Sequence, residues 1–244
     1  MPIDIPPEKD GLVPTLNHMG WMTVGLDQFS RSFVDFAPHA PGPVLDIGAA
    51  YGIASLAALK NGATVIANDL DARHLELLEK NTPKNHRSRL SLMAGAFPEN
   101  ISFADHTLGA VLICRVLHFF DGPTIEKSIA KLFRWLKSGG KVFAIGETVY
   151  LKNMQGFIPL YENRLKNPDD AWPGYFENVH EICDPDVKDA LPPQIHFFDL
   201  NTLTRCFEKA GFTIEKAAIF GRPEYPEWAR LDGRESAGII AIKP

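Results

Sequence analysis

Short apolar runs alternate with segments of helical periodicity through the middle of the chain. A short apolar run bounded by turn residues predicts a buried strand, and apolar positions three and four residues apart predict a helix. We predict strands at 44–47, 64–67, 90–93, 110–114 and 141–145, and helices between them at 53–61, 72–80 and 123–136. Repeated strand–helix units of this length predict a doubly wound, mostly parallel sheet with helices on both faces.

Further elements are expected on both sides of this core. Residues 1–17 hold four prolines and predict an irregular arm, whereas the apolar positions from His18 to Phe36 recur at helical spacing. A helix at 200–210 and two strands at 212–219 and 237–242 bring the expected sheet to seven strands.

One long segment has no clear period. Residues 147–196 combine aromatic side chains with prolines, and such a segment in a compact domain is usually a functional lid or insertion. We therefore expect a single domain with an N-terminal arm and helix, a ligand-binding core, a cap insertion, and a closing helix and strands. Their expected ranges are 1–42, 43–146, 147–196 and 197–244.

Composition argues against polyanionic and membrane partners. The 244 residues carry a formal net charge of −5, so neither nucleic acid nor an anionic membrane is an expected partner. No apolar run approaches the ~20 residues of a membrane span, and the first residues lack the basic and apolar regions of a secretory signal. The three cysteines are widely separated, without metal-ligand spacing, which predicts reduced thiols, no metal site and a cytoplasmic location.

The first predicted strand ends in an acid and a glycine-containing turn. Asp46 precedes Gly48, Ala50 and Gly52, and the helix begins directly afterwards. A strand, a tight turn and a helix in this order place backbone N–H groups and a helix N-terminus at one mouth, where a nucleotide-like ligand binds. A dinucleotide site needs glycine at the sixth place of the turn, where Ile53 stands. Asp46 suits an ammonium group, so we expect a nucleoside with a cationic tail.

A second acid follows the next strand. Asp69 lies 21 residues after Gly48, where an acid accepts hydrogen bonds from both ribose hydroxyls in nucleoside sites of this topology. The alternative is that Asp69 caps the following helix, but Asp71 is better placed to be that N-cap.

From these residues the chain resembles the class I S-adenosylmethionine-dependent methyltransferases, in the small-molecule branch that includes type 11 and ubiquinone-biosynthesis-like enzymes. The resemblance spans roughly residues 43–146. It rests on Val44–Gly52, Asp69, Gly95–Phe97, Leu108–Phe120 and Leu136–Val142. It implies a Rossmann-like fold and S-adenosyl-L-methionine as cofactor. The implied cofactor-binding residues are Asp46, Gly48, Ala50, Gly52, Asp69, Leu70, Ala96, Phe97 and Arg115.

Two positions depart from the family pattern. Ala50 stands where the family often has glycine, and Ala96 stands where it often has an aspartate that accepts the adenine amino group. That hydrogen bond must then come from Glu99 or the main chain, or be missing.

The resemblance implies in-line transfer of a methyl group to an acceptor, with a general base needed only if the acceptor must lose a proton. His118 is the candidate base or orienting group, the alternative being a structural histidine at the strand-to-helix turn. Arg115 meets the cofactor carboxylate or a substrate acid, or else pairs with Asp121 or Glu147. Trp21 and His180 are candidate substrate residues, against an anchoring role for Trp21 and a surface or hinge role for His180.

The side chains of the expected cap should determine which methyl acceptor binds. Residues 151–196 hold eight acids against four bases, and with the aromatic side chains this favours a small organic acceptor in an enclosed pocket. The alternative is that the acids form a solvated face.

Other functions remain to be weighed. A nicotinamide-dependent oxidoreductase would need glycine near position 53, and an RNA methyltransferase is disfavoured by the charge. A non-catalytic S-adenosylmethionine-binding module agrees with the missing acid at Ala96. A methyltransferase acting on a protein would need an open groove. The sequence leaves open the acceptor's identity and the oligomeric state.

Overall fold

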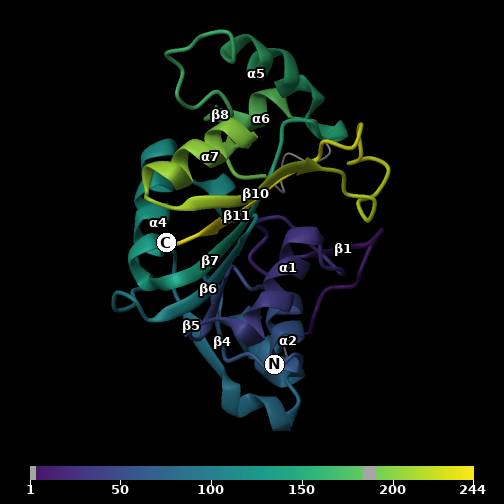
Figure 1. The fold of residues 1–244 in the computed structure, drawn as a ribbon. Helices are drawn as coiled ribbons and strands as arrows, with labels where there is room; N and C mark the ends of the chain where they lie inside the picture. Colours follow the sequence, from purple (N-terminus) through teal and green to yellow (C-terminus); the bar gives the residue numbers. More distant parts are fainter. Residues whose placement is uncertain (1–3, 184–190) are drawn as a thin grey trace.

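A seven-stranded sheet forms the centre of the molecule, and the computed structural model describes residues 4–183 and 191–244 (Figure 1). Its strands stand in the order β10-β11-β7-β6-β3-β4-β5. All neighbouring pairs are parallel except those of β11, which is antiparallel to both β7 and β10. The strand bounds are β3 Val44–Ile47, β4 Val65–Asp69, β5 Leu90–Ala94, β6 Leu108–Cys114, β7 Leu136–Glu147, β10 Thr213–Phe220 and β11 Ser236–Ile242.

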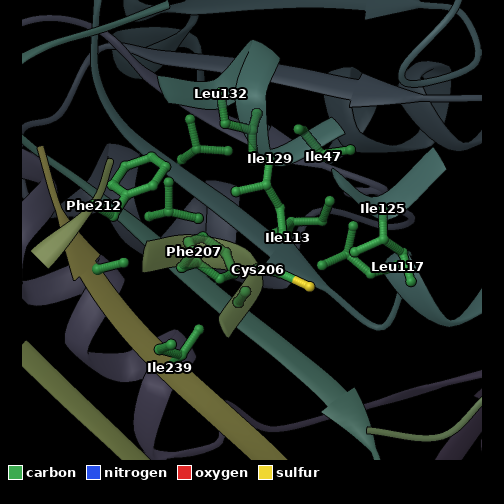
Figure 2. Close-up of a cluster of buried hydrophobic side chains, with 14 of the residues drawn as sticks. Ile47, Ile113, Leu117, Ile125, Ile129, Leu132, Cys206, Phe207, Phe212 and Ile239 are labelled. Carbon is green, nitrogen blue, oxygen red and sulfur yellow. The ribbon is translucent and has the colours of Figure 1, made fainter. Parts of the chain in front are cut away.

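Alternate residues of the central strands face two separate apolar layers. In β6, Val111 and Ile113 belong to one buried cluster, while Ala110 and Leu112 belong to another. Helices α4 (Gly122–Trp135) and α7 (Leu200–Lys209) cover the first face, and Figure 2 shows their side chains meeting Ile113 and Ile239. Helices α1 (Gln28–Phe36) and α2 (Ile53–Lys60) cover the other. The doubly wound seven-stranded sheet predicted from the sequence is therefore confirmed.

Four helices begin at an aspartate whose side chain accepts hydrogen bonds from the backbone of the first turn. Asp71 caps α3 (Ala72–Asn81), as predicted, by accepting from the Arg73 N–H. The other three caps are Asp27 on α1, Asp121 on α4 and Asp199 on α7.

The N-terminal segment differs from the prediction. Instead of one helix from His18 to Phe36, the chain forms β2 (Trp21–Thr23), which pairs with β1 (Leu12–Pro14), and only then begins α1. Gly20, with φ of +117°, lies in the turn between the two strands, and α1 begins only after its N-cap residue, Asp27. The apolar spacing did not indicate this change, because apolar residues at positions 21 and 22 fit a strand as well as a helix. Residues 12–23 are called the N-terminal hairpin below.

The segment predicted as a cap has regular structure of its own. It contains the short helices η4 (Lys152–Phe157), α5 (Ile158–Arg164) and α6 (Val179–Ile182), and the strand pair β8 (Tyr175–Phe176) and β9 (Ile195–His196). Figure 1 shows α5, α6 and β8 gathered at one end of the molecule. Their apolar side chains form a separate cluster that also includes Leu12 of the N-terminal hairpin and Tyr225.

Other boundaries move by a few residues. Helix α4 ends at Trp135 and β7 already begins at Leu136, so Gly139 lies within the strand and does not end the helix. The remaining short helices are η1 (Ala37–His39), η2 (Lys84–Arg89) and η3 (Leu117–Phe119). Within the described ranges, no helix has the length and apolar character needed to cross a membrane.

Candidate active site

A cavity of about 350 Å³ lies where five parallel strands end. The carboxyl ends of the strands are where ligands bind in open α/β sheets. Residues at or just after the ends of β3, β4, β5, β6 and β7 line the cavity: Gly48, Asp69, Gly95, Arg115 and Glu147. The N-terminal hairpin, η3, η4, the segment around β9 and the loop after β10 supply further walls, which are largely apolar. These walls include Trp21, Met22, Leu151, Met154, Tyr225 and Trp228.

The turn after β3 adopts the left-handed backbone that its glycine allows. Gly48 has φ of +70°, and a Cβ there would lie 2.5 Å from Cγ2 of Val116, so no larger residue fits without movement. Ala50 also has a positive φ, +47°, and its N–H donates to Oδ2 of Asp69 at 2.8 Å. Gly48 and Ala50 both line the cavity.

Gly52 has a different role from its predicted one. It is absent from the residues that line the cavity, and a Cβ there would lie 2.1 Å from Cδ1 of Leu78. Its φ of +81° starts α2, and its lack of a side chain lets α2 and α3 approach each other. The structure therefore assigns Gly52 to packing.

Asp69 lines the cavity with its carboxylate held in place. Oδ2 accepts from the Ala50 N–H, and Oδ1 accepts from the Asp71 N–H at 2.9 Å. Oδ1 also lies 3.0 Å from Nδ1 of His74. A carboxylate offers about four acceptor positions, so these three bonds leave capacity for a ligand hydroxyl.

Apolar residues after β4 and β5 also line the cavity. Leu70 is 56% exposed although it belongs to the lining, and Ala96 and Phe97 line the cavity from the chain segment after β5. The side chain of Asn68 donates to the carbonyl oxygens of Met93 and Gly95, at 2.9 Å each, and so ties the ends of β4 and β5 together.

Glu99, the side-chain acceptor considered for an adenine amino group, is not among the residues that line the cavity. Its carboxylate lies 3.2 Å from Lys127 on α4 and is more than half exposed. Of the two sources considered for that hydrogen bond, the side chain of Glu99 is therefore out of place.

A smaller recess of about 70 Å³ adjoins the main cavity and shares Gly48, Ala50 and Arg115 with it. Asp46 lines this recess and not the main cavity. Its Oδ2 accepts from the Ser55 hydroxyl at 2.7 Å. Burial raises the pKa of Asp46 to about 6, against the opposing effect of the Ser55 hydrogen bond. A cation bound beside Asp46 would stabilise the charged form of this carboxyl group, which burial disfavours.

Arg115 lies between the recess and the main cavity. Its backbone φ is +55°, an uncommon conformation for a residue without glycine's freedom. Its Nη1 donates to the Tyr225 hydroxyl at 3.0 Å and lies 3.9 Å from Oε1 of Glu147. Asp121, the other partner considered for Arg115, instead caps α4.

Glu147 completes this polar group. Its Oε1 accepts from the Tyr225 hydroxyl and its Oε2 accepts from the Ser236 hydroxyl at 2.9 Å. Both carboxylate oxygens are therefore occupied by neutral donors, while the guanidinium of Arg115 has one side-chain partner within hydrogen-bond distance. Further N–H groups of Arg115 therefore remain to donate to a ligand in this part of the cavity.

Two buried polar atoms of the cavity lining have no partner among the described residues, Nδ1 of His118 and Oδ1 of Asn153. A buried polar group without a partner costs about 1–3 kcal/mol, which a ligand's hydrogen bond would recover. Burial, and secondarily the charge of Arg115, lowers the pKa of His118 to about 3. His118 is accordingly a neutral imidazole at physiological pH.

Of the two predicted substrate residues, the structure brings one to the cavity. Trp21 lines it, and its ring meets that of Trp228 edge to face with centroids 6.1 Å apart. His180 does not line it, although its Nε2 lies 2.8 Å from the carbonyl oxygen of Leu191, which does. His196 is fully buried against Phe198, also outside the lining.

The sequence did not single out Asn153, Tyr225, Trp228 or Met154 as cavity residues. Tyr225 and Trp228 lie in the loop between β10 and β11, more than 150 positions from the glycine turn, and only the folded sheet brings these parts together. A signal was present in the chain, since two aromatic residues flank prolines in a short loop that leads into the last strand. Four charged residues counted in the cap, Asp184, Asp186, Lys188 and Asp189, lie outside the described residues.

Comparison with known proteins supplies an independent line of evidence. The family model described as a methyltransferase domain matches residues 44–140. No curated protein matches the chain by sequence. Many solved structures are similar in fold, among them an S-adenosylmethionine-dependent methyltransferase from Methanosarcina mazei, with TM-score 0.65, 18% identity, and coverage of 90% of this chain and 99% of the other.

Two further structures agree. A methyltransferase of the same description from Mesorhizobium loti has TM-score 0.61 and 18% identity, covering 89% of this chain and 100% of the other. The glycopeptide N-methyltransferase MtfA, solved with S-adenosylmethionine, has TM-score 0.57 and 16% identity, covering 88% and 92%. At this level of identity the likeness concerns the fold. Together with the family match over the glycine turn and its neighbours, it shows that residues 44–140 match a methyltransferase domain and that the chain has the fold of S-adenosylmethionine-dependent methyltransferases.

Proposed function

We propose that the protein transfers the methyl group of S-adenosylmethionine to a small organic acceptor by in-line displacement. One observation carries the proposal: a single cavity is lined both by the segments at the strand ends that match the family and by a largely apolar wall from the N-terminal hairpin, η4 and the loop before β11. S-adenosylmethionine supplies an already activated methyl group on a sulfonium, so the protein's main task is to align the acceptor and exclude water.

The lining fits the parts of the cofactor. Asp69 would accept from a ribose hydroxyl with its remaining acceptor capacity, and Leu70, Ala96 and Phe97 would contact the adenine. The small recess fits the amino-acid end: the buried carboxylate of Asp46 would bind the ammonium group, and Arg115 would bind the carboxylate. Gly48 and Ala50 line both spaces and so mark their junction.

The acceptor would occupy the remaining part of the cavity. The walls there are aromatic and apolar, with Trp21, Met154 and Trp228 among them, which favours a small acceptor with an apolar body. The unpartnered atoms of His118 and Asn153 favour an acceptor that carries hydrogen-bond donors, such as hydroxyl or amino groups.

His118 would orient the reacting group and receive its proton. With its pKa near 3, the imidazole is too weak a base to deprotonate a free hydroxyl at neutral pH. A hydroxyl oxygen becomes strongly acidic once it bonds to the arriving methyl group, so even a weak base then accepts the proton. His118 would therefore act late in the displacement, by holding the hydrogen bond along which the proton leaves.

The proposal is tested by product formation. The purified protein is incubated with S-adenosylmethionine and a panel of small aromatic compounds bearing hydroxyl or amino groups, and S-adenosylhomocysteine and methylated product are measured together. Stoichiometric formation of both supports the proposal. Binding of S-adenosylmethionine without any turnover on the panel favours the non-catalytic module, and turnover only with a protein substrate favours a protein methyltransferase.

A further inference from the structure

We propose that His74 couples cofactor binding to the docking of the N-terminal hairpin, and so acts as a positioning residue for the whole cavity. The proposal rests on the proposed function in one respect, namely that Asp69 binds the cofactor ribose. It concerns a residue of α3 that no sequence motif singled out, and whose side chain is 1% exposed.

The two ring nitrogens of His74 have different partners. Nε2 lies 2.9 Å from the backbone nitrogen of Leu16, whose N–H only donates, so Nε2 is the unprotonated acceptor. Nδ1 then carries the hydrogen of the neutral ring and donates it to Oδ1 of Asp69 at 3.0 Å. A continuous chain of hydrogen bonds thus runs from the hairpin backbone through one imidazole to the predicted ribose-binding carboxylate.

Neighbouring residues attach the hairpin at the same place. The Tyr51 hydroxyl donates to the carbonyl oxygen of Pro14 at 2.7 Å, and Nη2 of Arg73 donates to that of Leu16 at 2.9 Å. The Tyr51 ring also meets the His74 ring edge to face, with centroids 5.1 Å apart. These hairpin contacts come from the glycine turn and the start of α3, the two segments that border the ribose position.

The docked hairpin forms a large part of the cavity wall. Residues on both of its strands and in the turn between them line the cavity: Leu12, Thr15, Asn17, Gly20, Trp21 and Met22. Release of the hairpin at Leu16 would open that wall to water and remove Trp21 from the acceptor side. A ligand that orders Asp69 therefore favours the docked hairpin, and by reciprocity the docked hairpin favours the ligand.

Substitution of His74 by asparagine separates its two hydrogen bonds. The amide of His74→Asn reaches the position of Nδ1 and preserves the donor to Asp69, but it is too short to accept from Leu16. We expect this variant to bind S-adenosylmethionine about 3–10-fold more weakly, the worth of one lost internal hydrogen bond. His74→Phe, which keeps the ring and its contact with Tyr51 but loses both bonds, would bind it more weakly still.

The experiment is amide hydrogen exchange, resolved by peptide, on the full-length protein with and without saturating S-adenosylmethionine. In the wild type the cofactor should slow exchange over residues 12–23 at least about 5-fold, and His74→Asn should abolish this slowing while core strands keep theirs. His86→Gln, which alters a histidine of η2 bonded to Arg89, is the matched control and should retain the effect.

The outcomes separate this proposal from the proposed function. If the wild type binds S-adenosylmethionine but exchange in the hairpin does not change, or if His74→Asn retains the full slowing, the coupling is refuted and the function stands. If the wild type does not bind S-adenosylmethionine, the proposed function fails. The hairpin attachment is then judged from the ligand-free proteins, in which His74→Asn must exchange faster over residues 12–23. Tyr51→Phe gives a second, milder measure, because it removes only the bond to Pro14.

Discussion

Arg115 donates a hydrogen bond to the hydroxyl of Tyr225 across 110 positions of sequence, and the same hydroxyl donates to Glu147. The phenol thus bridges the guanidinium and the carboxylate. Arg115 and Glu147 are 3.9 Å apart at their nearest atoms, so the hydroxyl carries the shorter contacts to both. This arrangement keeps Arg115 oriented toward the cavity.

Tyr225→Phe removes that hydroxyl while preserving the ring. Arg115 then loses its hydrogen-bonded orientation and moves closer to Glu147, so the affinity for S-adenosylmethionine should fall about 3–10-fold. Calorimetric titration measures the change. Tyr175→Phe is the control, since its hydroxyl bonds to Gln194 away from the cavity lining, and it should bind as the wild type does. Equal affinity for Tyr225→Phe would mean that Arg115 does not contact the cofactor.

Asp69→Asn tests the ribose position. The substitution removes the charge that strengthens hydrogen bonds from the ribose hydroxyls, and we expect a loss of about 1.5–3 kcal/mol in binding free energy, at least tenfold in affinity. Asp71→Asn is the matched control, because it changes an acid two residues away that caps α3, and asparagine also caps helices well. An unchanged affinity for Asp69→Asn would place the ribose elsewhere.

The buried carboxyl of Asp46 predicts a pH dependence of stability. Its pKa of about 6 in the folded protein lies above the ordinary value of 3.8, so between these values the folded state holds a proton that the unfolded state has lost. Stability therefore falls as pH rises from about 4 to 6, by about 3 kcal/mol for a shift of this size, and the loss is complete above pH 6. Asp46→Asn should lack this component when denaturant unfolding is compared at pH 4 and pH 7.

The same carboxyl predicts proton release on ligand binding. If the ammonium group of S-adenosylmethionine meets Asp46, it stabilises the charged form, and binding near pH 6 should release a fraction of a proton from the wild type and none from Asp46→Asn. Calorimetry in buffers of different ionisation enthalpy measures this release. An equal proton count for the two proteins would place the ammonium group away from the recess.

His118→Phe tests the acceptor side. Loss of the imidazole should lower kcat, because the acceptor loses the group that orients it and receives its proton, while the affinity for S-adenosylmethionine stays within about 2-fold. Since burial lowers the pKa of His118 to about 3, the rate of the wild type should show no inflection near pH 6.5 from this residue. His86→Gln should leave kcat unchanged, because His86 lies in η2, outside the cavity lining. A full loss of cofactor affinity in His118→Phe would contradict the assignment to the acceptor side.

The sequence predicted the central strands of the sheet well because they are buried and mostly apolar. Val44–Ile47, apart from Asp46, and Leu108–Cys114 are of this kind, and the glycine turn that follows Val44–Ile47 lies at the cavity. An N-cap could also be predicted where an aspartate precedes a segment with apolar residues at helical spacing, as Asp71 does.

The missed features depend on contacts between distant segments. The pairing of β1 with β2 rests on Leu12 meeting Thr23 across a turn, and the local apolar spacing of Trp21 and Met22 fits a helix as well as a strand. Gly52 matched a ligand-binding motif in the sequence, but in the structure the close approach of Leu78 in the next helix accounts for the lack of a side chain at this position. Tyr225 and Trp228 reach the cavity only through the closing strand pair.

The most direct test of the account is calorimetric titration of the purified protein with S-adenosylmethionine and, in parallel, with NAD. The account predicts binding of S-adenosylmethionine in the micromolar range, weakened at least about tenfold in Asp69→Asn, and no binding of NAD. Binding of NAD in place of S-adenosylmethionine, or of neither compound, would contradict it.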